Sequence, residues 1–123
     1  FYMTPMEASF VKYGVNSFLA SKVLWFNQFK DLVDRNDSRY SVVANAIGYD
    51  ERIGKGHTKV PGFDGKKGFG GSCFPKDTSA IANFAGGSLT VLEEVIEANN
   101  LYRSQYMLDD REKEQNVSFN STI

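Results

Sequence analysis

The chain has 123 residues, of which 41% are hydrophobic, and this is enough for one compact domain with a single core but not for two. Fourteen lysines and arginines stand against 15 aspartates and glutamates, so no excess positive charge is available to attract a nucleic acid or an anionic membrane. A single cysteine excludes an internal disulfide, and no apolar stretch or leader pattern indicates a membrane span or export. We therefore expect a cytoplasmic protein with neither nucleic acid nor membrane as a partner.

A long helix is predicted at the amino-terminal end. Thr4-Pro5-Met6-Glu7 combines a capping threonine, a proline at the first helical position and a glutamate three residues after the cap. Apolar residues then recur at spacings of three and four, and no proline follows until Pro61, so the helix is predicted to run to about Arg35. Apolar residues also lie off this stripe, and one small core cannot cover them all. A second copy of the chain is expected to cover the rest.

Three shorter helices are predicted after the long one. Residues 36–38, Asn-Asp-Ser, end the first helix and can cap a second that runs through Ala46. Gly48 is predicted to end this second helix in the left-handed backbone conformation. Asp77 or Thr78 can cap a third helix, which Gly86-Gly87 stops. Residues 90–93, Thr-Val-Leu-Glu, form a capping box that opens a fourth. The predicted fold class is all-α, built on one long amino-terminal helix and three shorter helices.

Two segments are predicted to lack regular structure. Between Gly48 and Ser72 the chain carries eight glycines, Pro61 and scattered lysines, a composition typical of a long exposed loop. At the other end, residues 109–114 are all charged and are expected to be solvated, and residues 115–123 are expected to form a flexible tail. The folded domain is thus predicted to span residues 1–114.

The only cysteine lies in the sequence Gly-Phe-Gly-Gly-Ser-Cys-Phe-Pro-Lys-Asp at residues 68–77. A lone thiol is either a buried packing residue or a nucleophile, and the glycines before Cys73 favour the nucleophile because they leave its approach open. Lys76 supplies a nearby cation, and Asp77 supplies a carboxylate that can hold a water. The alternative for Asp77 is a purely structural helix cap.

Lys12 and Asn16 are one helical turn apart and so project from one face of the predicted first helix. Apolar residues flank this face, which suggests a functional lysine, although a lysine that extends to solvent beside an asparagine is the simpler reading of the spacing alone. Spacing does not decide between the two.

Several other kinds of site fit the sequence poorly. His57 lies in a glycine-lysine loop, and nothing around it resembles the signature of a cysteine hydrolase. The glycines at 48 and 54 are spaced wrongly for a P-loop, and no Gly-x-Gly-x-x-Gly opens a helix after a strand. One cysteine and one histidine make a poor zinc site.

Three ordered motifs closely resemble the UDP-glucose/GDP-mannose dehydrogenase family. They are residues 12–20, Lys-Tyr-Gly-Val-Asn-Ser-Phe-Leu-Ala, residues 48–54, Gly-Tyr-Asp-Glu-Arg-Ile-Gly, and the cysteine motif at 68–77. The resemblance implies the helical central domain of such an enzyme, with a fold like the carboxy-terminal domain of 6-phosphogluconate dehydrogenase, and a homodimer. It also implies oxidation of the C6 alcohol of a nucleotide sugar to a carboxylate, with NAD as the cofactor and a covalent cysteine adduct between the two oxidations.

The same resemblance assigns roles to individual residues. Cys73 matches the nucleophile that forms a thiohemiacetal and then a thioester, and Lys12 matches the lysine that stabilises the oxyanion. Asn16 matches the asparagine that helps to hold the C6 oxygen or water, and Asp77 the carboxylate that assists thiol activation and hydrolysis. Arg52 matches an arginine that reaches the sugar bound in the other subunit. The remaining residues expected at the substrate are Phe69, Gly70, Gly71 and Lys76, and the glycines are expected to leave room for the sugar.

The resemblance also limits what this chain can do. Ser72 and Phe74 favour UDP-glucose as the nucleotide sugar, whereas loop 55–67 is longer and more polar than is typical of the family. No NAD-binding motif occurs in the 123 residues, so NAD is expected to bind a domain outside this chain, without which the segment is expected to be inactive. The alternative function is a dimerisation or interaction module that keeps the fold without catalysis.

Overall fold

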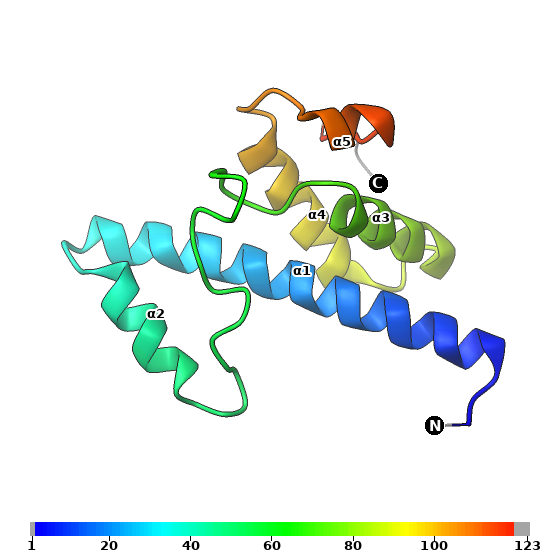
Figure 1. Cartoon of the computed structure of the whole chain (residues 1–123), viewed down its shortest axis with the longest axis horizontal. Helices are drawn as coiled ribbons and strands as arrows, with labels where there is room; N and C mark the ends of the chain where they lie inside the picture. The colour runs from blue at the N-terminus through cyan, green and yellow to red at the C-terminus, as the bar shows by residue number, and fades with distance from the viewer. Residues whose placement is uncertain (1, 120–123) are drawn as a thin grey trace.

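The computed structural model describes residues 2–119, and all regular structure in this range is helical (Figure 1). The helices are α1 (Pro5–Arg35), α2 (Tyr40–Gly48), α3 (Cys73–Ala85), α4 (Thr90–Arg103) and α5 (Asp110–Glu114). The all-α prediction is confirmed, with one short helix more than expected. None of the helices within residues 2–119 is long and apolar enough to cross a membrane.

Helix α1 is the spine of the molecule and has the predicted length of 31 residues. Its predicted capping box is present: the Thr4 hydroxyl accepts from Glu7 N at 3.1 Å, and the Glu7 carboxylate accepts from Thr4 N at 2.8 Å. In Figure 1, α3, α4 and α5 lie on one side of α1 and α2 on the other, and loop 49–72 crosses α1 to join the two sides. The loop thereby connects α2 to the start of α3.

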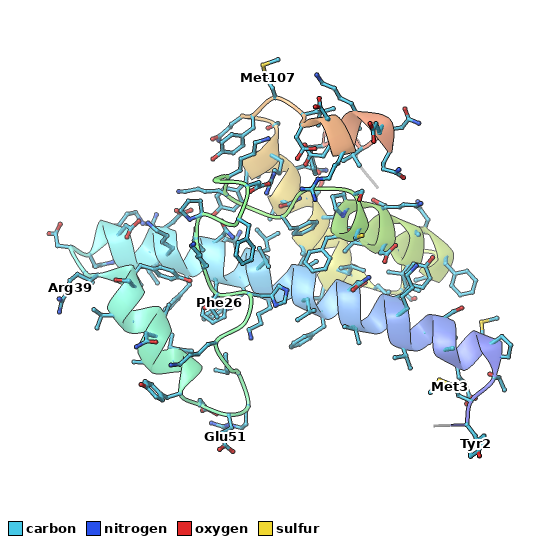
Figure 2. All side chains as sticks on the ribbon, viewed as in Figure 1. Tyr2, Met3, Phe26, Arg39, Glu51 and Met107 are labelled. Atoms are coloured by element: carbon cyan, nitrogen blue, oxygen red, sulfur yellow. The ribbon has the colours of Figure 1, made fainter. Side chains whose placement is uncertain are left out.

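Three clusters of buried apolar residues form the core. The first joins the end of α1 to α2 and the loop, and Figure 2 labels one of its members, Phe26. The second joins Ala20 and Leu24 of α1 to Phe69, directly before α3, and the third joins α3 to α4. The middle cluster therefore supports the segment that carries the cysteine motif.

Several predicted helix ends are wrong in detail. Helix α2 begins at Tyr40 after Arg39, and α4 begins at Thr90 after Leu89, and neither preceding residue makes a side-chain capping bond. Gly48 is the last residue of α2 and does not have a positive φ. A Cβ at Gly48 would lie 2.7 Å from Lys55 Cγ, so the returning loop explains this glycine. Gly86 does end α3 in the left-handed conformation, as predicted, with φ 60°.

The segment after α4 is more ordered than the sequence suggests. Asp109 caps α5 by accepting from Glu112 N at 2.8 Å, and Glu112 accepts in turn from Asp109 N at 2.9 Å. The prediction that these charges are all solvated is wrong, because Glu112 is 1% exposed. Of the expected tail, residues 115–119 are described and include the buried Phe119, while residues 120–123 lie outside the described part. Met107, at the bend between α4 and α5, is exposed (Figure 2).

Candidate active site

Cys73 is the first residue of α3 and its side chain is exposed. The prediction that this helix begins at Asp77 or Thr78 is wrong by one full turn. The first amides of a helix have no partner within it, and Ser72 makes no side-chain capping bond to them. The exposed thiol therefore lies at the end of a helix dipole that favours negative charge.

Asp77 lies one turn after Cys73 and is 6% exposed. Asn16 of α1 donates from Nδ2 to Asp77 Oδ2 at 2.7 Å. The interpretation of Asp77 as a helix cap is wrong, since it belongs to the second turn of α3. Because residues four apart share a helix face, the held carboxylate and the thiol face the same way. The structure thus brings together residues from two of the three motifs, those at 12–20 and 68–77.

Lys12 lies one turn before Asn16 on α1, and its side chain is exposed. Its ammonium group is 5.3 Å from the centre of the Tyr13 ring and forms no ion pair with residues 2–119. Lys76, in the first turn of α3, is also exposed. It lines a cavity of about 330 Å³ between α3, α4 and residues 115–119.

Arg52 is not brought to Cys73 within this chain. It lies in the loop after α2, next to Glu51, which Figure 2 labels at the end of the molecule opposite α5. Its guanidinium is paired with Asp50, at 2.7 Å between Nη2 and Oδ2, and its side chain is 88% exposed. It borders an apolar hollow of about 360 Å³ that also includes Phe18 and Trp25. Arg52 is therefore accessible at the surface of the chain.

The turn before Cys73 is held by buried polar side chains that the sequence analysis did not identify. Asn27 of α1 accepts from Gly68 N at 2.8 Å. Asn99 of α4 accepts from Phe69 N at 2.7 Å and donates to Phe69 O at 2.9 Å. Arg103 donates to Gly68 O at 3.1 Å. The side chain of Phe69, one of the residues predicted at the substrate, is packed in the core with Ala20 and Leu24.

A buried ion pair lies beneath the same turn. Arg103 Nη1 is 2.7 Å from Asp64 Oδ2 and 3.7 Å from Glu112 Oε2, while Glu112 Oε2 also accepts from Gly71 N at 2.9 Å. Burial raises the pKa of Asp64, but the hydrogen bonds and charges of Arg103 and Lys66 outweigh it, so the pKa is lowered. Two carboxylates therefore balance the positive charge of the buried Arg103 guanidinium.

The glycines of the turn are explained by close contacts with other side chains of the same chain. A Cβ at Gly68 would lie 2.4 Å from Asn99 Oδ1, and a Cβ at Gly70 would lie 2.2 Å from Arg103 Nη1. Gly68 also has a φ of 77°, a conformation that favours glycine. The close approach to these side chains is sufficient to require glycine, whether or not a sugar lies on the other side.

A signal for the buried polar residues is present in the sequence. Asn99 and Arg103 continue the helical stripe that Leu92 and Ile96 begin, at spacings of four, three and four. Asn27 continues the stripe of Ala20 and Leu24 on α1 in the same way. A polar residue on an otherwise buried helix face must be hydrogen-bonded, which would have indicated a packed backbone segment opposite it.

His57 and Cys73 are the residues that a cysteine hydrolase or a zinc site would use, two kinds of site that fit the sequence poorly. His57 is exposed with φ 62°, and its ring centre is 6.0 Å from that of Phe74. The polar contact found for Cys73 Sγ within residues 2–119 is to Ser72 Oγ at 4.0 Å, so no Cys-His pair is formed there. The described residues also contain no group of three or more His, Cys, Asp or Glu side chains that could hold a metal ion.

Comparisons with known proteins agree with the sequence motifs. Residues 6–101 match the family model described as the UDP-glucose/GDP-mannose dehydrogenase family, central domain. The chain is 42% identical over 100 residues to UDP-glucose 6-dehydrogenase TuaD of Bacillus subtilis, covering 79% of the chain and 21% of that protein. It is 37% identical over 114 residues to UDP-glucose 6-dehydrogenase YwqF of the same organism, covering 89% and 24%. It is 34% identical over 105 residues to UDP-glucose 6-dehydrogenase of Rickettsia typhi, covering 82% and 23%. The chain thus spans less than a quarter of the length of these relatives.

Proposed function

Because the chain belongs to the UDP-glucose/GDP-mannose dehydrogenase family, we propose that it is the central domain of an NAD-dependent enzyme that oxidises UDP-glucose to UDP-glucuronate. One observation carries this proposal. Cys73 is exposed at the start of α3, while Asp77, one turn further, is buried and bonded to Asn16 of α1. An exposed thiol beside a rigidly held carboxylate suits a nucleophile whose adduct is later hydrolysed.

The covalent chemistry is assigned to Cys73. Its sulfur attacks C6 of the sugar aldehyde, a C–S bond forms, and the carbonyl oxygen takes a proton to give a thiohemiacetal. Once this adduct has been oxidised to a thioester, water attacks the carbonyl carbon. The C–S bond then breaks, which releases the carboxylate and returns the thiol. The enzyme needs this adduct because it retains the aldehyde between the two oxidations.

The neighbouring residues have separate roles. The exposed ammonium of Lys12 stabilises the oxyanion that forms when the sulfur or water attacks. Asp77 orients the attacking water and accepts its proton, and the Asn16 amide fixes the carboxylate for this task. Lys76 and the backbone of Gly70 and Gly71 contact the substrate.

NAD does not fit the residues described here. Residues 2–119 contain no strand and no glycine-rich turn from a strand into a helix, which a dinucleotide site of the usual kind requires. We therefore assign NAD binding and the hydride transfers to another part of the enzyme. The cytoplasm is its proposed location, since the cell keeps a lone reactive thiol reduced there.

The experiment is to assay the complete natural protein for conversion of UDP-glucose to UDP-glucuronate, with and without Cys73→Ser. We expect the variant to lose about a thousandfold or more in product formation, because a hydroxyl cannot replace the thiolate as the nucleophile. Ser41→Ala, at an exposed position of α2, is the control and should retain activity. Full turnover by Cys73→Ser would remove the nucleophile from the mechanism.

We also propose that the chain forms a homodimer through α1. Six apolar residues on this helix are each more than half exposed: Met6, Phe10, Val11, Val15, Phe18 and Trp25. An apolar groove of about 660 Å³ lies beside them, between α1, the end of α3 and the start of α4. A contiguous apolar surface of this kind indicates a protein interface. In such a dimer Arg52 would reach the sugar bound by the other subunit.

The same apolar face supports the second candidate function, a dimerisation module without catalysis. Light scattering of the 123-residue chain at micromolar concentration tests the interface, and we expect a dimer. Phe18→Glu places a charge in the interface and should weaken the dimer by about a hundredfold or more. Gln28→Glu, also exposed on α1, is the matched control. A monomeric wild-type chain would contradict both the dimer and the module.

A further inference from the structure

We propose that α5 and the connection leading to it clamp the turn in front of Cys73, and that Glu112 is a positioning residue for this nucleophile. The role of Cys73 as a nucleophile rests on the proposed function, whereas the contacts of the clamp do not depend on it. The clamp lies beyond residues 6–101, the part that the family model matches. It is therefore a feature of this chain that the family assignment does not supply.

Glu112 connects α5 to the turn with both carboxylate oxygens. Oε1 accepts from Asp109 N at 2.9 Å and so belongs to the cap of α5. Oε2 accepts from Gly71 N at 2.9 Å, two residues before the thiol. Glu112 is buried, whereas the four other residues of α5 are exposed. Within α5, the buried hydrogen bond to the turn thus comes from Glu112, while the exposed Arg111 lies beside Gly71, where a Cβ would be 3.4 Å from its Nη2.

Arg103 completes the clamp from the other side. Its Nη2 donates to Gly68 O at 3.1 Å, and its Nη1 is 3.7 Å from Glu112 Oε2. Gly70 lies between the two charged groups, because a Cβ there would be 2.2 Å from Arg103 Nη1 and 2.5 Å from Glu112 Oε2. The arginine and the glutamate therefore leave the turn no room to shift toward them.

The clamp acts on Cys73 through three residues of backbone. Phe69 is fixed in the core, Gly71 is fixed by Glu112, and α3 begins two residues later. Ser72 makes no side-chain capping bond, so the start of α3 is oriented by the turn before it. If Glu112 is removed, Gly71 N loses its buried acceptor and Arg103 keeps Asp64 as its carboxylate partner. The direction of the thiol is then less well defined.

The first test measures amide hydrogen exchange in the 123-residue chain for Glu112→Ala, Glu112→Gln and the control Glu114→Gln. Glu114 is an exposed glutamate on the same helix. We expect exchange at Gly71 to accelerate by about tenfold or more in Glu112→Ala, and less in Glu112→Gln, which keeps an acceptor oxygen. Exchange at Leu24, in the core of α1, should stay within about twofold in all three variants.

The second test uses the complete natural protein and separates kcat from KM. In Glu112→Ala we expect kcat for UDP-glucuronate formation to fall about tenfold, with KM for UDP-glucose within about threefold, and partial recovery in Glu112→Gln. Unchanged Gly71 exchange, or an equal acceleration at Leu24, would overturn the clamp whatever the activity. Unchanged kcat with accelerated Gly71 exchange would overturn the positioning role. If the unmodified protein does not oxidise UDP-glucose, the proposed function fails and the positioning role fails with it, while the exchange result still decides the clamp.

Discussion

The glycines on either side of Lys67 have different physical roles although they form one glycine-rich stretch. A Cβ at Gly54, Gly56 or Gly65 would meet no atom within 4 Å. A Cβ at Gly68 or Gly70 would lie within 2.5 Å of a buried side chain. The first group permits turns in an exposed loop, and the second permits close packing. Composition alone does not separate the two.

The backbone contacts of the two segments differ in the same way. Within loop 49–67 many hydrogen bonds are local, such as Gly65 N to Gly62 O at 3.0 Å. In the turn at 68–71 the partners are buried side chains from α1, α4 and α5. The backbone directly before Cys73 is therefore fixed by residues distant in sequence, whereas much of the loop backbone is bonded to its own neighbours. The predictions below test this difference.

The largest effect is expected for Asn99→Ala. This change leaves both Phe69 N and Phe69 O buried without their partner, and each unsatisfied group is costly. We expect the free energy of unfolding to fall by about 3 kcal/mol, measured by urea denaturation. Asn83→Ala, at an exposed position of α3, is the control and should change it by less than about 0.5 kcal/mol. Similar values for the two variants would mean that the turn is no better anchored than the surface.

Gly70→Ala should have the next largest effect, and Gly56→Ala is its matched control. The new Cβ at position 70 would push against Arg103 and Glu112, which are held by other contacts and cannot both move away. We expect a loss of about 2 kcal/mol in the free energy of unfolding. At position 56 the added methyl meets open space at a negative φ, so a change within about 0.5 kcal/mol is expected. If both changes were tolerated equally, the comparison between the two glycine groups would not hold.

Sequence predicted the local features of this fold well. The capping box at Thr4, the length of α1 and the left-handed Gly86 are all present, because each depends on residues within a few positions of one another. The start of α3 was misjudged for a similar reason. Asp77 has the chemistry of a helix cap, but its carboxylate is bonded to Asn16, which is 61 positions away in sequence. Local propensity could not show that contact.

The sequence motifs indicated Cys73 and its neighbours in the candidate site but not the buried side chains that hold the turn before it. Cys73, Asn16 and Asp77 belong to recognisable motifs, and the structure places Asn16 beside Asp77, one turn from the thiol. Glu112 was missed because a run of charges at 109–114 suggests a solvated helix, and nothing local shows which glutamate faces inward. Arg103 was missed because it is a charged residue at the polar end of the buried stripe of α4. Their burial depends on a contact with the glycine turn about 40 positions earlier. Such contacts can be identified from the three-dimensional structure, or from a polar residue at the end of a buried helical stripe.

The smallest effect is expected at Asp31, where the exposed loop and the buried turn meet. Asp31 accepts from Lys67 Nζ at 2.8 Å and from Tyr102 Oη at 2.6 Å. Burial raises its pKa, but these hydrogen bonds and the charges of Lys67 and Lys30 outweigh it, so the pKa lies below its ordinary value of 3.8. A carboxyl whose pKa is lowered in the folded state stabilises that state above its unfolded pKa. This contribution is lost as the pH falls through the folded value.

We therefore expect Asp31→Asn to reduce the acid dependence of stability. The difference in urea midpoint between about pH 5 and about pH 3 should be smaller in the variant than in the wild-type chain, since asparagine cannot titrate. Asp37→Asn is the control, because Asp37 is exposed and forms no ion pair with residues 2–119. A pH dependence in Asp31→Asn equal to that of the wild type would show that Lys67 and Tyr102 do not hold the junction through this carboxylate. The turn would then depend on Asn27, Asn99, Arg103 and Glu112, and the boundary between the two segments would lie at Gly68.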